Sequence, residues 1–490
     1  MSEIIQLLTV ENTLSRKRHP SRQELDFLIR VANLDYDKQV AVVWAGQDEV
    51  WHTLSAVYRA TGHAGQEYWQ AQTTLYDENV HALPGVIRFA LLLRVKGEEF
   101  WDNNQGRDYT AAINTGINLS AELAMQNLSL DNHLEDGQQW FTIKIAVNPV
   151  FPAESVVIHW TKDNWRHRRH TQCRVSKQHR KAKTRIWSAR LKIGDAFRLQ
   201  FSICCKSQNQ ELWDNNHGEN YTARHAPLKV LILNLHCYQE EEQDRKFTQI
   251  AAAIDEQAVD VVCLQEVAEH WNHGHGDWAS NSANIINQRL RQSFHLFSDW
   301  SHLGFDRYRE GVAILSRYDL RNQHGAYVSD SHDIYNINSR KVVMARIATR
   351  YFGIINIFSA HLSWLEGGFQ QQFQRLRAWA DEQTGHEVKT TLLCGDFNIT
   401  AGSSGYRQVV ETRQYEDQFL AANAQGLFEA FFRVNDPHWR DYPTDDYRID
   451  YIFMNKDSNL RVTSARVLFT EQDYGRVSDH CGYLMTFEPK

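Results

Sequence analysis

The stretch ELWDNNHGENYT at Glu211–Thr222 repeats, almost unchanged, the stretch EFWDNNQGRDYT at Glu99–Thr110. Self-similarity at a long spacing indicates duplicated structural units. The match extends upstream, because VVWAGQDEVWHT from Val42 and VIHWTKDNWRHR from Val157 each place a tryptophan, a polar turn and a second tryptophan ahead of WDNN. About the first half of the chain therefore consists of two copies of one module.

Both copies contain short runs in which apolar and polar residues alternate, such as VIRFALLLRV and FRLQFSICCK, bounded by Gly, Asn and Asp. This pattern is typical of antiparallel strands in a β-sandwich. We therefore expect each copy to be a β-sandwich of immunoglobulin-like type.

The repeated WDNN phrase sets an aromatic ring beside short amides. A sugar presents a face of C–H groups and a rim of hydroxyls, so a glycan site needs an aromatic platform and groups that both donate and accept hydrogen bonds. In a single copy the commoner explanation is a turn that ends a strand beside a core tryptophan, because Asp and Asn cap turns. Two copies, each with an upstream tryptophan, favour the glycan site.

The phrase resembles the signature of the starch- and glycogen-binding modules of carbohydrate-binding family 21, an aromatic residue followed by DNN and then by an asparagine and a tyrosine. The resemblance covers about residues 25–225 and implies modules at 25–115 and 125–225, after a segment at 1–24, with a glucan or glycosylated polymer as partner. The sugar contacts that it implies are Trp51, Trp101 and Asn103 in the first copy, and Trp165, Trp213, Asn215 and Asn220 in the second. Asp108 stands where the pattern has an asparagine, which removes a donor from the first copy.

Length and composition fit this division. A chain of 490 residues has room for about three domains of ~150 residues. The N-terminus has only a short apolar run, and no apolar run of ~18 residues follows, so neither an export signal nor membrane insertion is expected. Seven cysteines without a framework spacing favour buried thiols in a reducing compartment. We therefore expect a cytoplasmic protein.

The net charge of -7 argues against a nucleic-acid coat over the whole chain. Positive charge is nevertheless concentrated in the second copy, in Arg166–Arg169 (RHRR) and Lys177–Arg185 (KQHRKAKTR). Two interpretations stay open for these runs: solvated loops, which local charge runs usually form, and a phosphate-binding patch.

After the polar joint TARHAP at Thr222–Pro227, continuous apolar runs such as LKVLILNLHC alternate with segments of helical periodicity such as EEEQDRKFTQIAAAIDEQ. This alternation predicts an α/β domain over residues 228–490. Polar residues follow or interrupt its apolar runs, at the strand ends where α/β sheets place their chemistry. They are Asn234, Glu266, His361, Asp396, Asn398, Asp450, Asp479 and His480.

This set of residues suits the hydrolysis of a phosphodiester. The reaction needs a hard cation that neutralises developing charge, oxygen ligands that hold the cation, and groups that orient water and protonate the leaving oxygen. Asn, Glu and Asp supply the oxygens, and the two histidines handle protons. Because cysteines are few near these positions, Mg²⁺ or Mn²⁺ is favoured over Zn²⁺.

The successive phrases LNLH, LQEV, SAHLSW, CGDFN, RIDYIF and VSDHCGYL resemble the motifs of the endonuclease/exonuclease/phosphatase superfamily, in the same order. The resemblance implies an α/β four-layer sandwich of deoxyribonuclease-I-like type over the whole span of 228–490. It also makes Glu266, Asn234 and Asp479 the metal ligands.

The same resemblance implies the catalytic roles. Asp396 aligns the attacking water, Asn398 holds the phosphate, and His480, oriented by Asp450, serves as general base or phosphate donor, with His361 on the other side of the phosphate. Tyr308 matches a phosphate-side tyrosine, Glu310 a second carboxylate for His361, and Arg340 an arginine of the nuclease branch.

Departures from the superfamily narrow the function. The chain has YRIDYIF where inositol-polyphosphate phosphatases carry a tryptophan-cysteine-aspartate-arginine phrase, and LQEVAEH without the lysine of abasic-site enzymes. The leading hypothesis is a Mg²⁺-dependent phosphodiesterase that cuts nucleic acid and is targeted by two sugar-binding modules. The alternatives are a phosphatase or phosphodiesterase acting on a phosphorylated glucan or other sugar-containing substrate, and a non-catalytic glycogen-binding scaffold.

Overall fold

The computed structural model describes residues 4–15, 20–62, 65–176, 183–208, 210–272, 274–424 and 448–490, without the side chains of 423–424. Backbone contacts divide the chain into two units, Met1–Ala226 and Pro227–Lys490. Of the second basic run, residues 177–182 lie outside the described ranges.

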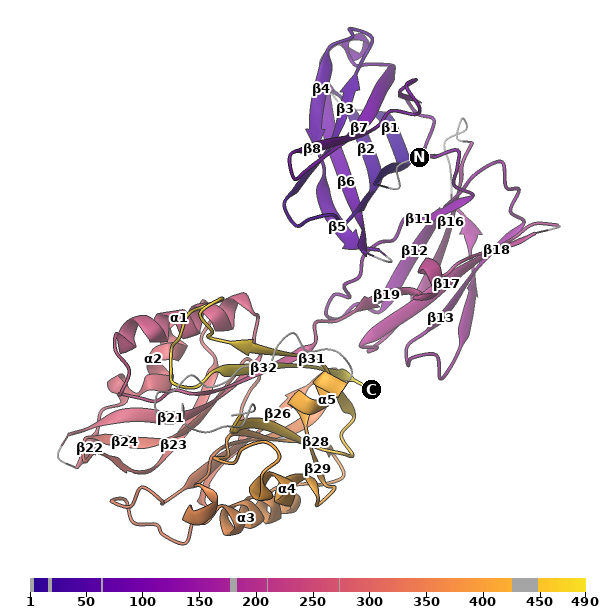
Figure 1. Cartoon of the computed structure of the whole chain (residues 1–490). Coiled ribbons are helices and arrows are strands. Elements are labelled where there is room, and N and C mark those ends of the chain that lie inside the picture. Colours follow the sequence, from indigo (N-terminus) through magenta and orange to yellow (C-terminus); the bar gives the residue numbers. More distant parts are fainter. Residues whose placement is uncertain are drawn as a thin grey trace. The chain divides into compact units, whose positions relative to one another are not determined.

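The first module is a β-sandwich of two antiparallel sheets (Figure 1). One sheet has the order β10-β1-β2-β6-β5, and the other has the order β4-β3-β7-β8 with β9 also paired to β7. The strands are β1 (Ile5–Ser15), β2 (Ser21–Ala32), β3 (Lys38–Ala45), β4 (Trp51–Ser55), β5 (Val57–Thr61), β6 (Gln66–Asp77), β7 (Val86–Val95), β8 (Glu98–Asp102), β9 (Tyr109–Ala112) and β10 (Asn118–Leu119). Alternate residues of both sheets meet in one core, where the rings of Phe27 and Phe89 lie 4.9 Å apart.

The expected separate segment at 1–24 is not separate in the structure. Strand β1 pairs along its length with β2, and its Ile5, Leu7 and Val10 are buried in the module's core. The first module therefore begins about twenty residues before the expected position 25, because the apolar alternation of β1 belongs to the same sandwich.

The second module repeats this architecture. Sheet β11-β12-β16-β15 packs against sheet β14-β13-β17-β18, with β19 also paired to β17. The strands are β11 (Met125–Asn127), β12 (Trp140–Val147), β13 (Ser155–Thr161), β14 (Arg169–Gln172), β15 (Arg174–Val175), β16 (Arg185–Lys192), β17 (Arg198–Lys206), β18 (Glu211–Asp214) and β19 (Tyr221–Arg224). The two sandwiches confirm the fold expected for the repeats.

The strand register aligns the two modules. Trp44 on β3 lies opposite Phe89 on β7, and Trp160 on β13 lies opposite Phe201 on β17; both tryptophans are buried. Strand β13 therefore corresponds to β3, and β17 corresponds to β7. The tryptophan that opens each upstream motif is a core residue.

The second unit contains two mixed sheets between helices (Figure 1). The first sheet has the order β23-β24-β21-β20-β32-β31, with β22 beside β21, and the second has the order β25-β26-β27-β28-β30-β29. The strands are β20 (Leu228–Asn234), β21 (Val261–Asn272), β22 (His275–Gly276), β23 (His295–Gly304), β24 (Tyr308–Ser316), β25 (Arg321–Tyr327), β26 (Lys341–Thr349), β27 (Gly353–His361), β28 (Val388–Asp396), β29 (Tyr415–Asp417), β30 (Asp450–Asn455), β31 (Leu460–Leu468) and β32 (Gly482–Pro489). Within each sheet one pair is parallel, β20 with β21 and β27 with β28.

Helices cover the outer face of each sheet, which makes four layers. The helices are α1 (Gln243–Glu256), α2 (Ser282–Arg289), α3 (Phe369–Glu382), α4 (Ser404–Val410) and α5 (Gln418–Ala424). Apolar residues of α1 and α2 share a core with β20 and β21, whereas those of α3 and α4 share a core with β27 and β28. The sheets face each other, and Gln265 Nε2 of the first donates to Ser359 Oγ of the second at 3.1 Å. The expected α/β four-layer sandwich is confirmed.

Candidate active site and glucan-binding surfaces

The carboxyl ends of the two parallel strand pairs bring five of the expected residues together. Asn234 ends β20, His361 ends β27, and Asp396 ends β28, directly opposite Asp450 at the start of β30. Glu266 sits in a bulge of β21 with a positive φ of 48°. Because a bulge re-aims the side chain of the extra residue, Glu266 points toward the other strand ends instead of continuing the alternation of β21.

Asn234 connects the two sheets at this point. Its Nδ2 donates to Glu266 Oε1 at 2.8 Å and to Asp396 Oδ2 at 3.1 Å, and its Oδ1 accepts from the backbone N–H of His236 at 3.0 Å. The assignment of amide oxygen and nitrogen follows from this hydrogen-bond pattern. In this arrangement Asn234 holds the two carboxylates in position.

The two carboxylates are buried together. Burial and the charge of Glu310 raise the pKa of Glu266 to about 7, and burial and the charge of Asp450 raise the pKa of Asp396 to about 7. Asp450 also has one carboxylate oxygen, Oδ1, that is buried without a hydrogen-bond partner among the described residues. A concentration of buried oxygen donors with raised pKa values fits a hard divalent cation, which stabilises their charged forms.

His480 is held in its charged form. Its Nδ1 lies 2.8 Å from Asp450 Oδ2, and its Nε2 lies 3.9 Å from Asp396 Oδ2. Burial lowers the pKa of His480, but the carboxylates of Asp450, Asp396 and Asp479 outweigh it, so the pKa is raised well above its usual value. The imidazolium therefore presents an Nε2–H toward Asp396.

His361, on the other side of Asp396, is held neutral. Burial and the adjacent Arg340 lower its pKa well below the usual value. Arg340 Nη1 lies 3.2 Å from His361 Nδ1, and because an arginine only donates, Nδ1 accepts and the proton resides on Nε2. That Nε2 is 3.7 Å from Asp396 Oδ2 and 4.0 Å from Glu266 Oε1. A neutral histidine, His361, and a charged histidine, His480, thus flank the carboxylate of Asp396.

Glu310 contacts a different histidine from the one expected. Glu310 Oε1 lies 3.3 Å from Nε2 of His302, so the imidazole that Glu310 contacts is that of His302, and His361 is oriented by Arg340 instead. Tyr308, on β24, packs its ring 5.3 Å from the ring of Tyr238. Sequence reasoning missed His302, because nothing marks a histidine inside a strand as the partner of a carboxylate eight residues later.

Asn398 fixes the loop after β28. Its backbone N–H donates to Asp396 Oδ1 at 2.8 Å, its Nδ2 donates to the carbonyl of Leu362 at 2.8 Å, and its φ is 51°. Asn398 therefore lies beside Asp396 with its amide nitrogen engaged by the backbone.

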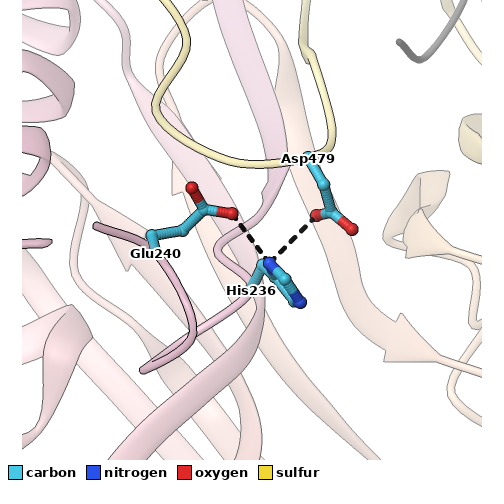
Figure 2. Close-up of side chains that lie close together, drawn as sticks. All are labelled: His236, Glu240 and Asp479. Carbon is cyan, nitrogen blue, oxygen red and sulfur yellow. Dashed lines mark hydrogen bonds and ion pairs between the residues drawn. The ribbon is translucent and has the colours of Figure 1, made fainter. Parts of the chain in front are cut away.

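Asp479 belongs to a group that the sequence analysis did not single out (Figure 2). His236 Nδ1 lies 2.7 Å from Glu240 Oε1 and 3.6 Å from Asp479 Oδ1, and Lys246 Nζ binds the other oxygen of Glu240 at 2.6 Å. The three side chains have donor atoms close enough to hold one ion, as do Glu266–His361–Asp396 and Asp396–Asp450–His480. His236 stands in the LNLH phrase, two residues after Asn234, which was the available signal.

The tryptophans of the modules differ in exposure. Trp51, Trp101 and Trp213 are 44%, 46% and 51% exposed, whereas Trp165 is half-buried in a turn with a φ of 65°. Trp51 begins β4, but Trp165 precedes β14 by four residues, so these two tryptophans do not occupy equivalent places. The resemblance of the upstream motifs therefore aligns their first tryptophans and not their second.

The remaining residues of the repeated phrase build the same turn twice. Tyr109 Oη donates to Asp102 and Tyr221 Oη donates to Asp214, at 2.9 and 2.7 Å. Asn103 Oδ1 accepts from the N–H of Gly106 and Asn215 Oδ1 accepts from that of Gly218, at 2.9 and 3.0 Å. These bonds support the turn explanation for the Asp and Tyr of the phrase, while the exposed tryptophans stay available for a ligand.

Hydrogen bonds also hold Asn220 and the rings of Trp101 and Trp213. Asn220 has a φ of 60°, and its carbonyl accepts from Asn216 Nδ2 at 3.3 Å. Trp101 Nε1 donates to Glu99 at 3.3 Å and Trp213 Nε1 donates to Glu211 at 2.7 Å, so each ring is held by the same kind of bond.

Across the described ranges, no helix combines the length and apolar character that crossing a membrane requires.

Comparison with known proteins places both halves of the chain. A curated relative, protein phosphatase 1 regulatory subunit 3E of Rattus norvegicus, is 38% identical over 82 residues, which cover 16% of this chain and 28% of the relative. The chain thus spans less than a third of that relative's length. An endonuclease/exonuclease/phosphatase family protein from Leptotrichia buccalis has 26% identity, covers 53% of this chain and 99% of its own, and superposes with a TM-score of 0.46. A mannosyl-6-phosphatase from Bacteroides thetaiotaomicron has 16% identity, the same shares, and a TM-score of 0.38.

The family matches cover nearly the whole chain. Residues 6–112 and 122–224 each match the carbohydrate/starch-binding module of family 21. Residues 232–480 match the endonuclease/exonuclease/phosphatase family, and this span contains all the strand-end residues described above. The chain belongs to the endonuclease/exonuclease/phosphatase family and carries two family 21 carbohydrate-binding modules ahead of that domain.

Proposed function

We propose that the chain hydrolyses phosphodiester bonds with the help of a bound divalent cation, Mg²⁺ or Mn²⁺, and that its two modules hold it on a glucan. The single observation that carries the proposal is the pair of buried histidines whose Nε2 atoms lie 3.7 and 3.9 Å from Asp396 Oδ2, where burial and Arg340 lower the pKa of His361 and the neighbouring carboxylates raise the pKa of His480. An acid and a neutral imidazole beside one carboxylate are the groups that a hydrolysis needs in order to move protons near neutral pH.

The cation site fits the residues present. Glu266 and Asp396 offer carboxylate oxygens within one group of close donor atoms, and Asn234 stands between them. Asp479, which we also propose as a ligand, belongs to the group of His236 and Glu240, and its Oδ1 lies 4.0 Å from His480 Nε2. When bound, the cation supplies charge neutralisation at the phosphate. Burial raises the pKa of Glu266 and of Asp396 to about 7, and a bound cation would favour the charged forms of both carboxylates.

The protein groups then divide the work. Asp396 accepts a proton from the attacking water and orients it, since its carboxylate lies between the two imidazoles. His480, charged and fixed by Asp450, donates its Nε2–H to a phosphate oxygen or to the leaving oxygen. His361 donates its Nε2–H to a non-bridging oxygen, and Arg340 keeps that tautomer in place.

The exposed tryptophans and the buried cysteines support a proposal for the ligand of the modules and for the cellular location. The exposed Trp51, Trp101 and Trp213 support binding of glucan by both modules, because a stacked sugar ring needs an accessible aromatic face. All seven cysteines are free and buried, which supports a reducing, cytoplasmic location.

The substrate that we propose first is a nucleic acid. A second candidate, a phosphate ester carried by glucan itself, is favoured by one observation: exposed arginines stand in the turn ahead of β14, in the same module as Trp213. In that case the modules bind the substrate and not merely its surroundings.

The test offers linear DNA, RNA, a phosphorylated glucan and a generic phosphodiester to the purified chain, with Mg²⁺, with Mn²⁺ and with chelator. Asp396→Asn is the matched inactive control, because it keeps the shape of the side chain. We expect cation-dependent cleavage of a diester by the wild type and none by Asp396→Asn. Cleavage that persists in chelator, or no cleavage of any of the four substrates, would contradict the proposal.

A further inference from the structure

The outward-facing sides of the two equivalent sheets differ in chemistry. The outer face is the side of β4-β3-β7-β8, or of β14-β13-β17-β18, that points away from the module's core. In the first module the core takes Val42 and Trp44 of β3, so Val43 points outward, opposite Ala90 of β7. In this row the outer face of the first module therefore carries the small side chains of Val43 and Ala90, with Thr53 of β4 opposite Val43 on its other side.

In the second module the corresponding row carries imidazoles. The core takes Ile158 and Trp160 of β13, so His159 points outward, where it lies opposite His170 of β14. The ring of Trp213 lies 4.8 Å from the ring of His159, tilted by 42°. The Trp213–His159 ring pair, with His170 opposite His159 on the next strand, thus takes the place of the small side chains in the first module.

Beside these rings stands a turn with unbalanced positive charge. Arg166 and Arg168 are exposed, and no hydrogen bond or ion pair engages either guanidinium among the residues that the structure describes. The one carboxylate in this turn, that of Asp163, is already bound by His167 at 2.6 Å. Arg168 precedes His170 by two residues, a distance of about 7 Å along an extended chain, so its guanidinium is within reach of a ligand on the rings.

In the first module the arginine beside the tryptophan platform has a carboxylate partner. Arg88 on β7 lies with its guanidinium 5.3 Å from the ring centre of Trp51, and its Nε is 3.4 Å from Asp108 Oδ2. An arginine with a carboxylate partner offers little attraction to an anion. The two outer faces therefore differ in net charge as well as in polarity.

We propose that the outer face of the second module binds glucan that bears phosphate monoesters, and that the first module binds unmodified glucan. Trp213 supplies the platform for a glucose ring, the imidazoles of His159 and His170 hydrogen-bond to hydroxyls, and Arg166 and Arg168 bind the phosphate. A guanidinium group binds phosphate through paired, charge-assisted N–H donors, and it binds a neutral sugar hydroxyl more weakly. The inference rests on the glucan binding proposed above and adds the form of glucan that each module selects.

The experiment measures the affinity of the full chain, in chelator so that no ester is hydrolysed, for a linear maltodextrin that bears phosphate monoesters and for the same dextrin after dephosphorylation. Each charge-assisted hydrogen bond to the phosphate favours the phosphorylated dextrin, so we expect it to bind ~10-fold or more tightly than the dephosphorylated one. Arg166→Gln with Arg168→Gln should abolish this difference and leave the affinity for the dephosphorylated dextrin unchanged.

Matched variants locate the effect. Arg190→Gln is the control, because Arg190 is also exposed and lies over Trp140 on the other sheet of the same module, 5.2 Å from its ring centre. We expect this variant to keep the preference. Trp213→Ala should weaken binding of the phosphorylated dextrin, whereas Trp101→Ala should weaken binding of the dephosphorylated one.

Three results would overturn the inference: equal affinity of the wild type for both dextrins, a preference that survives the double arginine variant, or a single-stranded oligonucleotide that binds more tightly than either dextrin and depends on the same arginines. The last result would make the basic face a nucleic-acid site. Failure of the chain to bind either dextrin would instead remove the glucan targeting in the proposed function, and is recognised separately because Trp101→Ala would then have no effect.

Discussion

The candidate active site and the glucan-binding surfaces are built in opposite ways. In the second unit Asp396, Asp450 and His480 are at most 8% exposed and are positioned by one another. In the modules Trp51, Trp101 and Trp213 are 44–51% exposed, and each is supported by its own strand. Groups that depend on each other should fail together, whereas separate exposed platforms should contribute independently.

The largest effect is expected where one buried carboxylate is removed. Glu266→Ala deletes an oxygen ligand and an acceptor of Asn234, so turnover should fall by about 10³ or more. The fold should survive, because Glu266 is not part of the apolar cores of the domain. Steady-state kinetics together with circular dichroism check this. Glu416→Ala, an exposed carboxylate on β29, is the control. Full turnover by folded Glu266→Ala would show that the buried cluster is not the active site.

The next effect tests interdependence directly. Asp450→Asn leaves His480 in place but removes the charge that favours its protonated form, so turnover should fall by about 10². His480→Gln should cost about as much, and the double variant little more. Additive losses in this double-mutant cycle would mean that the two side chains act separately and that the contrast with the modules is false.

The pH dependence of cation binding sharpens the same contrast. Burial and Glu310 raise the pKa of Glu266 to about 7, so the metal-free folded protein binds this proton more tightly than the unfolded chain does. That gain in stability is present at low pH and is lost as the pH rises toward 7, and a cation must displace the proton. We therefore expect Mn²⁺ affinity, measured by titration calorimetry, to rise from pH 5 to pH 7 and to level off above. Constant affinity over this range would contradict the coupling.

The smallest effect is expected on the exposed surface of the modules. Register places Gln200 of the second module where the first has Arg88, and Asn220 where the first has Asp108. Arg88 is 47% and Asp108 28% exposed, so their ion pair should contribute less than ~1 kcal/mol to the free energy of unfolding. Arg88→Gln or Asp108→Asn should each lower the thermal midpoint slightly, and the double variant should recover most of the loss. A double variant that is less stable than either single variant would contradict the idea that Gln200 and Asn220 of the second module take the place of the Arg88–Asp108 pair.

The two regions differ in how much of their structure the sequence predicts. The alternation of apolar runs and helical segments predicted an α/β domain with Asn234, His361 and Asp396 at strand ends, because the residue that ends an apolar run follows the strand directly. The four layers were implied by the family resemblance, and the bulge that re-aims Glu266 within β21 was not predictable. Partners across space were not predictable either: Glu310 contacts His302, and His361 contacts Arg340, through packing that no local pattern encodes. The roles assigned to these residues in catalysis remain predictions.

In the modules the repeated phrase predicted two similar sandwiches, but not their differences. Alignment by motif paired Trp51 with Trp165, whereas strand register separates them. It also presented Asp108 as the loss of a donor, although Arg88 next to it changed as well. A substitution in one strand acquires its meaning from its neighbour in the next strand, and only the sheet shows which residues are neighbours.

Asn234 has one further consequence, for the mechanics of the domain. Its single amide group donates one hydrogen to Glu266 of the first sheet and the other to Asp396 of the second. The side chain therefore links the two sheets through the interior of the domain. Separation of the sheets would leave both carboxylates without this donor at once. Breathing of the interior is therefore coupled to the state of the site, and a cation that occupies it should slow amide hydrogen exchange in β20 and β28 together, while the modules exchange as before.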